Sequence, residues 1–179
     1  MADYRRYFNP ARNLTLAFRG LHYGRYNYSE DFQGNNFIQP FFLGYESLIR
    51  GYAWESYTQS ECGNTSCTTV DRLYGQRIAV VSAEVRVPFI GTEQFGLVNL
   101  PYVPIELVAF TDAGVAWDDE RPATWSLSRS STERVPLFST GVSARMNILG
   151  IMILEAYYAY PWQRPVKGAH WGFNMAPGW

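Results

Sequence analysis

Long segments in which apolar residues alternate with polar or small ones constrain the fold of this 179-residue chain most strongly. In the segment 77–89, every second residue from Ala79 to Phe89 is apolar, and Ser82, Glu84 and Arg86 lie between them. A period of two residues is that of a β-strand, whose successive side chains point to opposite faces. The same alternation predicts strands at 14–26, 103–118, 138–148, 151–162 and 169–179, after a truncated strand that ends at Phe8. We therefore predict one all-β domain over residues 1–179, with about seven or eight antiparallel strands connected up and down.

The predicted strands suit a membrane better than a soluble sheet. The longest, 103–118, is far above the usual strand length of about 5–6 residues, whereas a membrane-spanning strand needs about 9–11. The apolar faces of the last five predicted strands carry no charged residue. Aromatic residues gather toward strand ends, as in the interfacial girdles of transmembrane barrels; they are Trp117, Tyr158, Tyr160, Trp162, Trp171, Phe173 and Trp179. A transmembrane β-barrel is the favoured fold, and a soluble ligand-binding calyx is the alternative.

Composition and motifs exclude several other classes of protein. Aromatic and charged residues each make up 17% of the chain, whereas an average domain has about 25% charged residues. The net charge of −1 gives no basic surface for nucleic acid, and no apolar run is long enough for a transmembrane helix. The only two histidines, His22 and His170, are far apart, and no nucleophile elbow, phosphate-binding loop or dinucleotide motif occurs. We expect neither an enzyme nor a bound cofactor or metal.

Cys62 and Cys67 are the only cysteines of the chain. The polar residues between them include Gly63 and Asn64, which favour a turn that would bring the two thiols together. We predict a local disulfide, which would place this segment in an oxidising compartment. Two free surface thiols are the alternative.

The connection from residue 27 to residue 75 is the longest of the chain. Loops of this length are usually functional or disordered. The stretch Phe37–Gly44 is too apolar to lie in water, and we predict that this connection folds back into the barrel. Tight turns at 9–13 and 149–150 would lie on the opposite, periplasmic side, and the loops 119–134 and 161–168 would be external.

Three motifs carry a resemblance to a known family. They are Ile49-Arg50-Gly51-Tyr52 in the long connection, Glu84-Val85-Arg86-Val87-Pro88 in the next strand, and the stretch Phe110–Trp117 in the strand after that. In this order they resemble the outer-membrane barrels of the bacterial surface antigen superfamily, which includes BamA, TamA and the two-partner-secretion transporters. The resemblance spans Tyr4–Trp179 and corresponds to the C-terminal part of such a barrel.

This resemblance implies a function in the bacterial outer membrane. The expected activity is insertion or translocation of polypeptides, and the expected partners are outer-membrane lipid, unfolded outer-membrane or secreted polypeptides, and the barrel-assembly machinery. Family barrels have more strands than this chain supplies, so it would be part of a larger barrel or close by self-association. A barrel that anchors a larger fused protein in the membrane is the alternative.

Arg50, Glu84 and Asp112 form the candidate functional site. By alternation, Glu84 and Asp112 face inward on adjacent strands, and a loop that enters the lumen would place Arg50 between them. One guanidinium can hydrogen-bond two carboxylates and so clamp the loop. Gly51 would permit close backbone approach and Tyr52 would pack on the inner wall. The alternative is a solvated Arg50, with both carboxylates lining a wet lumen.

The C-terminal segment resembles the signal that the assembly machinery reads in such barrels. Gly172, Phe173 and the terminal Trp179 match its pattern, whereas Pro177 stands where an aromatic or aliphatic residue is usual. Because proline cannot donate to a strand ladder, we expect this strand to lie at a loosely paired edge. The alternative is that Pro177 merely ends the strand.

Overall fold

The computed structural model describes residues 1–26, 39–58, 61–62, 67–92, 94, 96–100, 104–126, 133–148 and 150–177. Within these residues one antiparallel sheet dominates, and its strands follow the chain order. The strands are β1 (Ala2–Ala11), β2 (Leu14–Gly24), β5 (Arg77–Gly91), β7 (Ile105–Trp117), β8 (Leu137–Ile148), β9 (Met152–Pro161) and β10 (His170–Pro177). A short strand, β6 (Val98–Asn99), pairs in parallel with the end of β5 and brings the sheet to eight strands. The predicted all-β, up-and-down antiparallel fold is confirmed.

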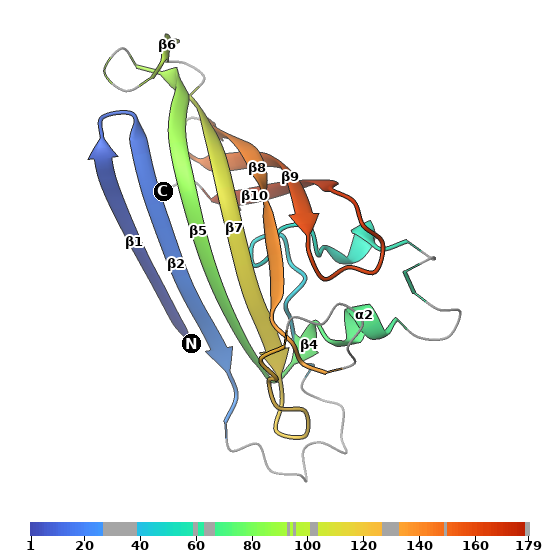
Figure 1. Ribbon diagram of the computed structural model, residues 1–179. Helices are drawn as coiled ribbons and strands as arrows, with labels where there is room; N and C mark the ends of the chain where they lie inside the picture. Colours follow the sequence, from blue (N-terminus) through green and yellow to red (C-terminus); the bar gives the residue numbers. More distant parts are fainter. Residues whose placement is uncertain are drawn as a thin grey trace.

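The sheet curls but does not close. Its path ends at β1 on one side and β10 on the other, and these two strands are not paired with each other (Figure 1). Every residue of β1 is exposed. A closed barrel has no such edges, so the described residues form an open section of a barrel wall.

Some strand ends differ from the sequence-based bounds. β1 continues to Ala11, with an irregular register between Phe8 and Ala11, so that the turn expected at 9–13 shortens to Arg12 and Asn13. A strand that is bent near its end can still pair with its neighbour, and the Pro10 of this edge strand does not break it. β10 is described up to Pro177, and Trp179 lies outside the described residues.

The long connection packs on the concave side of the sheet (Figure 1). It contains β3 (Phe41–Phe42) and β4 (Tyr74–Gly75), which form a separate two-stranded sheet, the 3-10 helix η1 (Trp54–Ser56) and the short helix α2 (Thr68–Asp71). Phe37, which was expected to pack inside with this loop, lies outside the described residues. The Cys62–Cys67 disulfide is formed within this connection.

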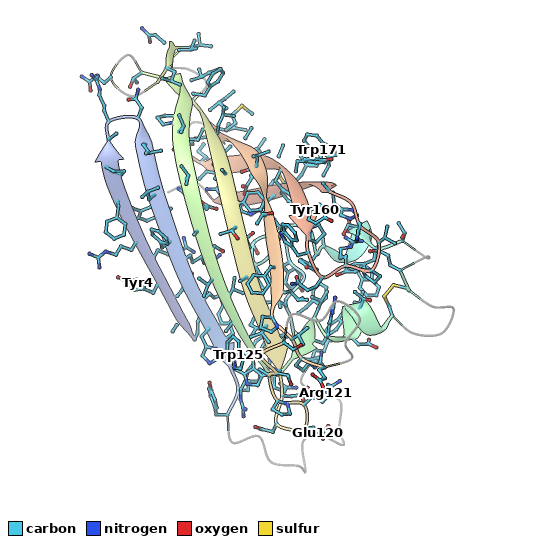
Figure 2. All side chains as sticks on the ribbon, viewed as in Figure 1. Tyr4, Glu120, Arg121, Trp125, Tyr160 and Trp171 are labelled. Atoms are coloured by element: carbon cyan, nitrogen blue, oxygen red, sulfur yellow. A yellow bond between two sulfur atoms is a disulfide. The ribbon has the colours of Figure 1, made fainter. Side chains whose placement is uncertain are left out.

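Burial follows the alternation that the sequence predicted. Side chains from the connection and from the inner strand faces form one core, made of Leu21, Leu43, Ile49, Tyr52, Val70, Leu73, Ile78, Val80, Ala116 and Leu137. Each fully buried aliphatic side chain contributes about 1.5–3 kcal/mol to folding, so this core holds the connection against the wall. On the outer face Val81, Val142 and Phe173 are exposed, and Tyr4 and Trp171 project away from the loop-filled side (Figure 2).

Within the described residues, no helix has both the length and the apolar character to cross a membrane.

Candidate functional site

Arg50 lies at a turn of the long connection that is closed by backbone hydrogen bonds. Leu48 N and Ile49 N both donate to Tyr45 O, at 2.8 and 3.0 Å. This turn directs the next side chain, Arg50, onto the inner face of the sheet, where it is 4% exposed. Ile49 anchors the turn, because its side chain is fully buried in the core beside Gly114, where an added Cβ would lie 2.4 Å from Ile49 Cδ1.

The guanidinium of Arg50 donates to carboxylates on three strands. Nε and Nη2 reach the two oxygens of Asp112 on β7, both at 2.8 Å. Nη2 also reaches Glu84 Oε1 on β5 at 2.9 Å, and Nη1 reaches Glu155 Oε1 on β9 at 2.9 Å. The bidentate contact with Asp112 is the geometry in which arginine binds carboxylates most strongly. The structure thus brings Arg50, Glu84 and Asp112 together, and adds Glu155.

The guanidinium of Arg50 also contacts an aromatic ring. Its Cζ lies 3.5 Å from the ring centroid of Phe110, which is an inner-face residue two positions before Asp112 on β7. A guanidinium over an aromatic face gains a cation–π attraction that is stronger where water is excluded. Phe110 therefore supports the guanidinium on its flat side, while the carboxylates bind its edge.

Two further arginines balance the charge of the cluster. Arg145 on β8 contacts Glu84 at 2.6 Å and Glu155 at 3.1 Å, and Arg86 on β5 contacts Glu84 at 2.7 Å. Ser143 Oγ donates to Glu155 at 2.6 Å. We call Arg50, Arg86, Arg145, Glu84, Asp112 and Glu155 the charge cluster. Its three cations and three carboxylates make it neutral, and such compensation is what allows charges to be buried.

Arg50 keeps its charge in this setting. Burial by itself would lower the pKa of Arg50, but the hydrogen bond to Asp112 and the attraction of Asp112, Glu155 and Glu84 outweigh it, so that the pKa of Arg50 is raised. The arginine side of the contact between loop and wall is therefore a cation.

Gly51 and Tyr52 lie beside the charge cluster. Gly51 has a φ of 87°, and a Cβ added to it would lie 3.1 Å from Ala159 Cβ, so glycine suits both its backbone conformation and its tight packing on β9. Gly51 N donates to Tyr157 Oη at 3.4 Å. The side chain of Tyr52 is fully buried, and its hydroxyl donates to Phe138 O at 3.0 Å. Both residues thus pack on the inner wall.

Sequence reasoning missed several members of this site. Glu155 and Arg145 lie on the polar faces of the alternating segments 151–162 and 138–148, but no pattern indicated that they would reach Arg50. Phe110 was part of a recognised motif without a role. Gln163 and Arg164, in the connection between β9 and β10, are buried against the loop, and because they lie outside any alternating segment no periodic signal could have marked them.

Gly172 and Phe173, two of the three residues of the expected C-terminal signal, lie on β10. Gly172 is buried on the inner face, where an added Cβ would meet the Tyr157 ring at 2.2 Å, and Phe173 is 73% exposed on the outer face. Trp179 is outside the described residues. In the described part of the chain, no His, Cys, Asp and Glu side chains are grouped to hold a metal ion.

Comparison with known families gives a match over most of the chain. The Omp85 superfamily domain matches residues 4–178, which is nearly the whole chain. Comparisons with curated proteins and with solved structures give no significant match. The family match agrees with the curled antiparallel sheet and the loop on its concave side. The chain therefore belongs to the Omp85 superfamily, whose outer-membrane β-barrels insert or translocate polypeptides.

Proposed function

We propose that this chain forms the C-terminal part of a bacterial outer-membrane barrel that inserts or translocates polypeptides, and that Arg50 clamps the long connection inside its lumen. The observation that carries the proposal is the set of hydrogen bonds from Arg50 to Asp112, Glu84 and Glu155. These carboxylates belong to β7, β5 and β9, so one loop side chain is fixed to three strands of the wall at once.

Breaking the contact between Arg50 and the carboxylates costs a large free energy, because the ions are buried. Removing one partner of a buried ion pair costs about 3–5 kcal/mol, because it leaves an uncompensated charge in a low-dielectric site. Loss of Arg50 would leave three carboxylates facing only Arg86 and Arg145. The loop should therefore stay in the lumen until a comparable free energy is supplied, for example by a polypeptide that binds in its place.

The surfaces of the sheet suit the proposed partners. The outer face carries exposed apolar side chains such as Val81 and Val142, which outer-membrane lipid would cover. Unpaired backbone groups on an edge strand such as β10 can pair with an unfolded polypeptide in extended form. Beside β10 lies a cavity of about 590 Å³, lined by loop residues that include Glu46 and Trp54 and by Gly172 and Phe173. The assembly machinery would read the segment that contains Gly172, Phe173 and Trp179, and self-association is another way to complete the barrel.

The test uses the full-length gene product in liposomes. Urea-unfolded outer-membrane protein is added, and its insertion is measured as the fraction that becomes protease-protected. We expect insertion by the wild type, and for Arg50→Ala both faster proteolysis of the long connection and a severalfold loss of insertion. The control is Arg121→Ala, since Arg121 lies at the far end of the sheet from β6 with Glu120 and Trp125 (Figure 2) and pairs with Asp118 at an exposed position.

Two outcomes would count against the proposal. If Arg50→Ala equals the wild type in both loop proteolysis and insertion, the clamp has no role. If wild-type protein anchors stably in the liposomes but inserts no client, the barrel is a membrane anchor for another part of the protein.

A further inference from the structure

Another arginine, Arg164, is buried against the same long connection but does not belong to it. It lies in the connection between β9 and β10 and is 1% exposed. Its Nε donates to Glu61 Oε1 at 2.8 Å and its Nη1 donates to Gly51 O at 3.1 Å. Nη1 and Nη2 donate to Ser56 Oγ and Ser56 O, both at 2.7 Å, and the guanidinium lies 4.0 Å from the Tyr57 ring centroid. All of these groups belong to residues 51–61, directly after Arg50.

The preceding residue, Gln163, extends this contact. Its Oε1 accepts a hydrogen bond from Phe138 N at 2.7 Å and lies 3.0 Å from Tyr52 Oη, whose single proton can go to Gln163 Oε1 or to Phe138 O. Its backbone N donates to Tyr52 Oη at 3.1 Å, and its carbonyl accepts from Arg72 Nη2 at 2.5 Å. Gln163 and Arg164 therefore bind the part of the loop that precedes the disulfide and also the part that follows it.

The disulfide lies between the two loop segments that reach this dipeptide. Glu61, the carboxylate partner of Arg164, directly precedes Cys62, and Arg72 follows α2, which begins one residue after Cys67. The covalent link keeps these segments together, so that Glu61 and Arg72 approach Gln163 and Arg164 as one unit. The Arg164–Glu61 pair is also ionised: burial alone would raise the pKa of Glu61, but the hydrogen bond from Arg164 lowers it below its ordinary value.

Arg50 and Arg164 join the loop and the wall from opposite sides of their contact. Arg50 is a loop residue bound to the wall, whereas Arg164 belongs to the wall's last connection and binds the loop. We propose that Arg164 is a positioning residue that couples the long connection to β10. Only five residues, 165–169, lie between Arg164 and the start of β10 at His170, so a displacement of β10 from the sheet would pull Arg164 away from Gly51, Ser56 and Glu61. Release of the edge strand and release of the loop then become one event.

This inference rests on the proposed function only where it assigns a use to the coupling, which is that opening at β10 would free the lumen. The contacts themselves predict a structural coupling whether or not polypeptides are inserted, and the two ideas can therefore fail separately.

The coupling is tested with pairs of spin labels on the full-length protein in liposomes. The two cysteines of this chain are paired in a disulfide, so neither competes with the introduced cysteines for the label. One pair, Trp54→Cys with Trp171→Cys, reports the distance from the loop to β10. The other, Val142→Cys with Trp171→Cys, reports the distance from β8 to β10. All three positions are exposed, which leaves the core undisturbed.

We expect one narrow distance population for both pairs in the wild type. Arg164→Gln should add a second, longer population for both, because the loop and the edge strand each lose a restraint. Glu61→Gln keeps the shape of the side chain but removes its charge, and should give the same result. Lys167→Gln, an exposed position in the same connection, should match the wild type. Heat-modifiable electrophoretic migration checks that each variant is folded.

The outcomes separate the two proposals. If Arg164→Gln broadens only the loop distance, or neither distance, Arg164 does not couple the loop to β10 and the inference is overturned, while insertion by the wild type still supports the proposed function. If both distances broaden but the wild type inserts no client, the coupling stands and the proposed function falls.

Discussion

Gly51 has a positive φ of 87° and a neighbour, Ala159, that an added Cβ would approach to 3.1 Å. Gly150 has a similar φ of 75°, but an added Cβ there meets nothing within 4 Å. Comparing Gly51 with Gly150 separates backbone strain from crowding. Both have a positive φ, but only Gly51 also has a close neighbour. A non-glycine residue in the left-handed region costs about 1–3 kcal/mol.

We predict that Gly51→Ala destabilises the loop more than Gly150→Ala does. Both variants pay the backbone cost, and Gly51→Ala must in addition push the loop away from β9 and lengthen the contacts of Arg50. Thermal unfolding of the folded band and proteolysis of the long connection measure the difference. Equal behaviour of the two variants would mean that the loop is not pressed against β9.

The site was predictable from sequence where a residue lay on an alternating strand or in a recognised motif. Glu84 and Asp112 satisfied both conditions, and Arg50 satisfied the second. Arg164 satisfied neither, because its position depends on how two irregular segments meet, 103 residues apart in the chain. Alternation puts Glu155 on the inward face of its strand. Its distance from Arg50, however, depends on how the sheet curls, which the period of two does not encode.

At the scale of the strand, alternation predicted six of the seven long strands to within a few residues at each described end, whereas β1 was expected only as a truncated strand that ends at Phe8. β3 and β4 have two residues each, too few for a periodic pattern to be recognised. β6 is equally short and pairs with β5 only beyond the point where β2 ends, since the β2–β5 ladder runs from Gly24–Arg77 to Thr15–Arg86. Such short pairings depend on which strand edge is left free, and that is known only after the sheet is built.

The outward face of these strands gives a prediction that tests the membrane assignment. Val142, near the middle of β8, is 57% exposed on that face. We predict that Val142→Arg impairs folding in liposomes, since an arginine facing lipid at the bilayer midplane costs about 2–4 kcal/mol. The control is Trp125→Arg, at an 85% exposed position outside the strands. Heat-modifiable migration measures the folded fraction, and a soluble calyx would tolerate both changes equally.

At the scale of the whole molecule, the open sheet is the main feature. Backbone groups along the free edges of β1 and β10 need partners in a bilayer, because lipid cannot hydrogen-bond them. β1 is exposed along its whole length, as expected for a strand that lacks its neighbour. The described residues are therefore a section of a wall whose completion requires further strands, from the same protein or from other copies.

The neutrality of the charge cluster has an electrical consequence for any water-filled path through such a wall. Rings of charged side chains set the ion selectivity of a pore, and the wild-type cluster has no excess of either sign. Arg50→Ala leaves one excess negative charge and should make the conductance prefer cations, whereas Glu84→Gln leaves one excess positive charge and should favour anions. Reversal potentials measured in planar bilayers under a salt gradient should therefore shift in opposite directions for the two variants, and a shift of both in the same direction would mean that ions do not pass the cluster.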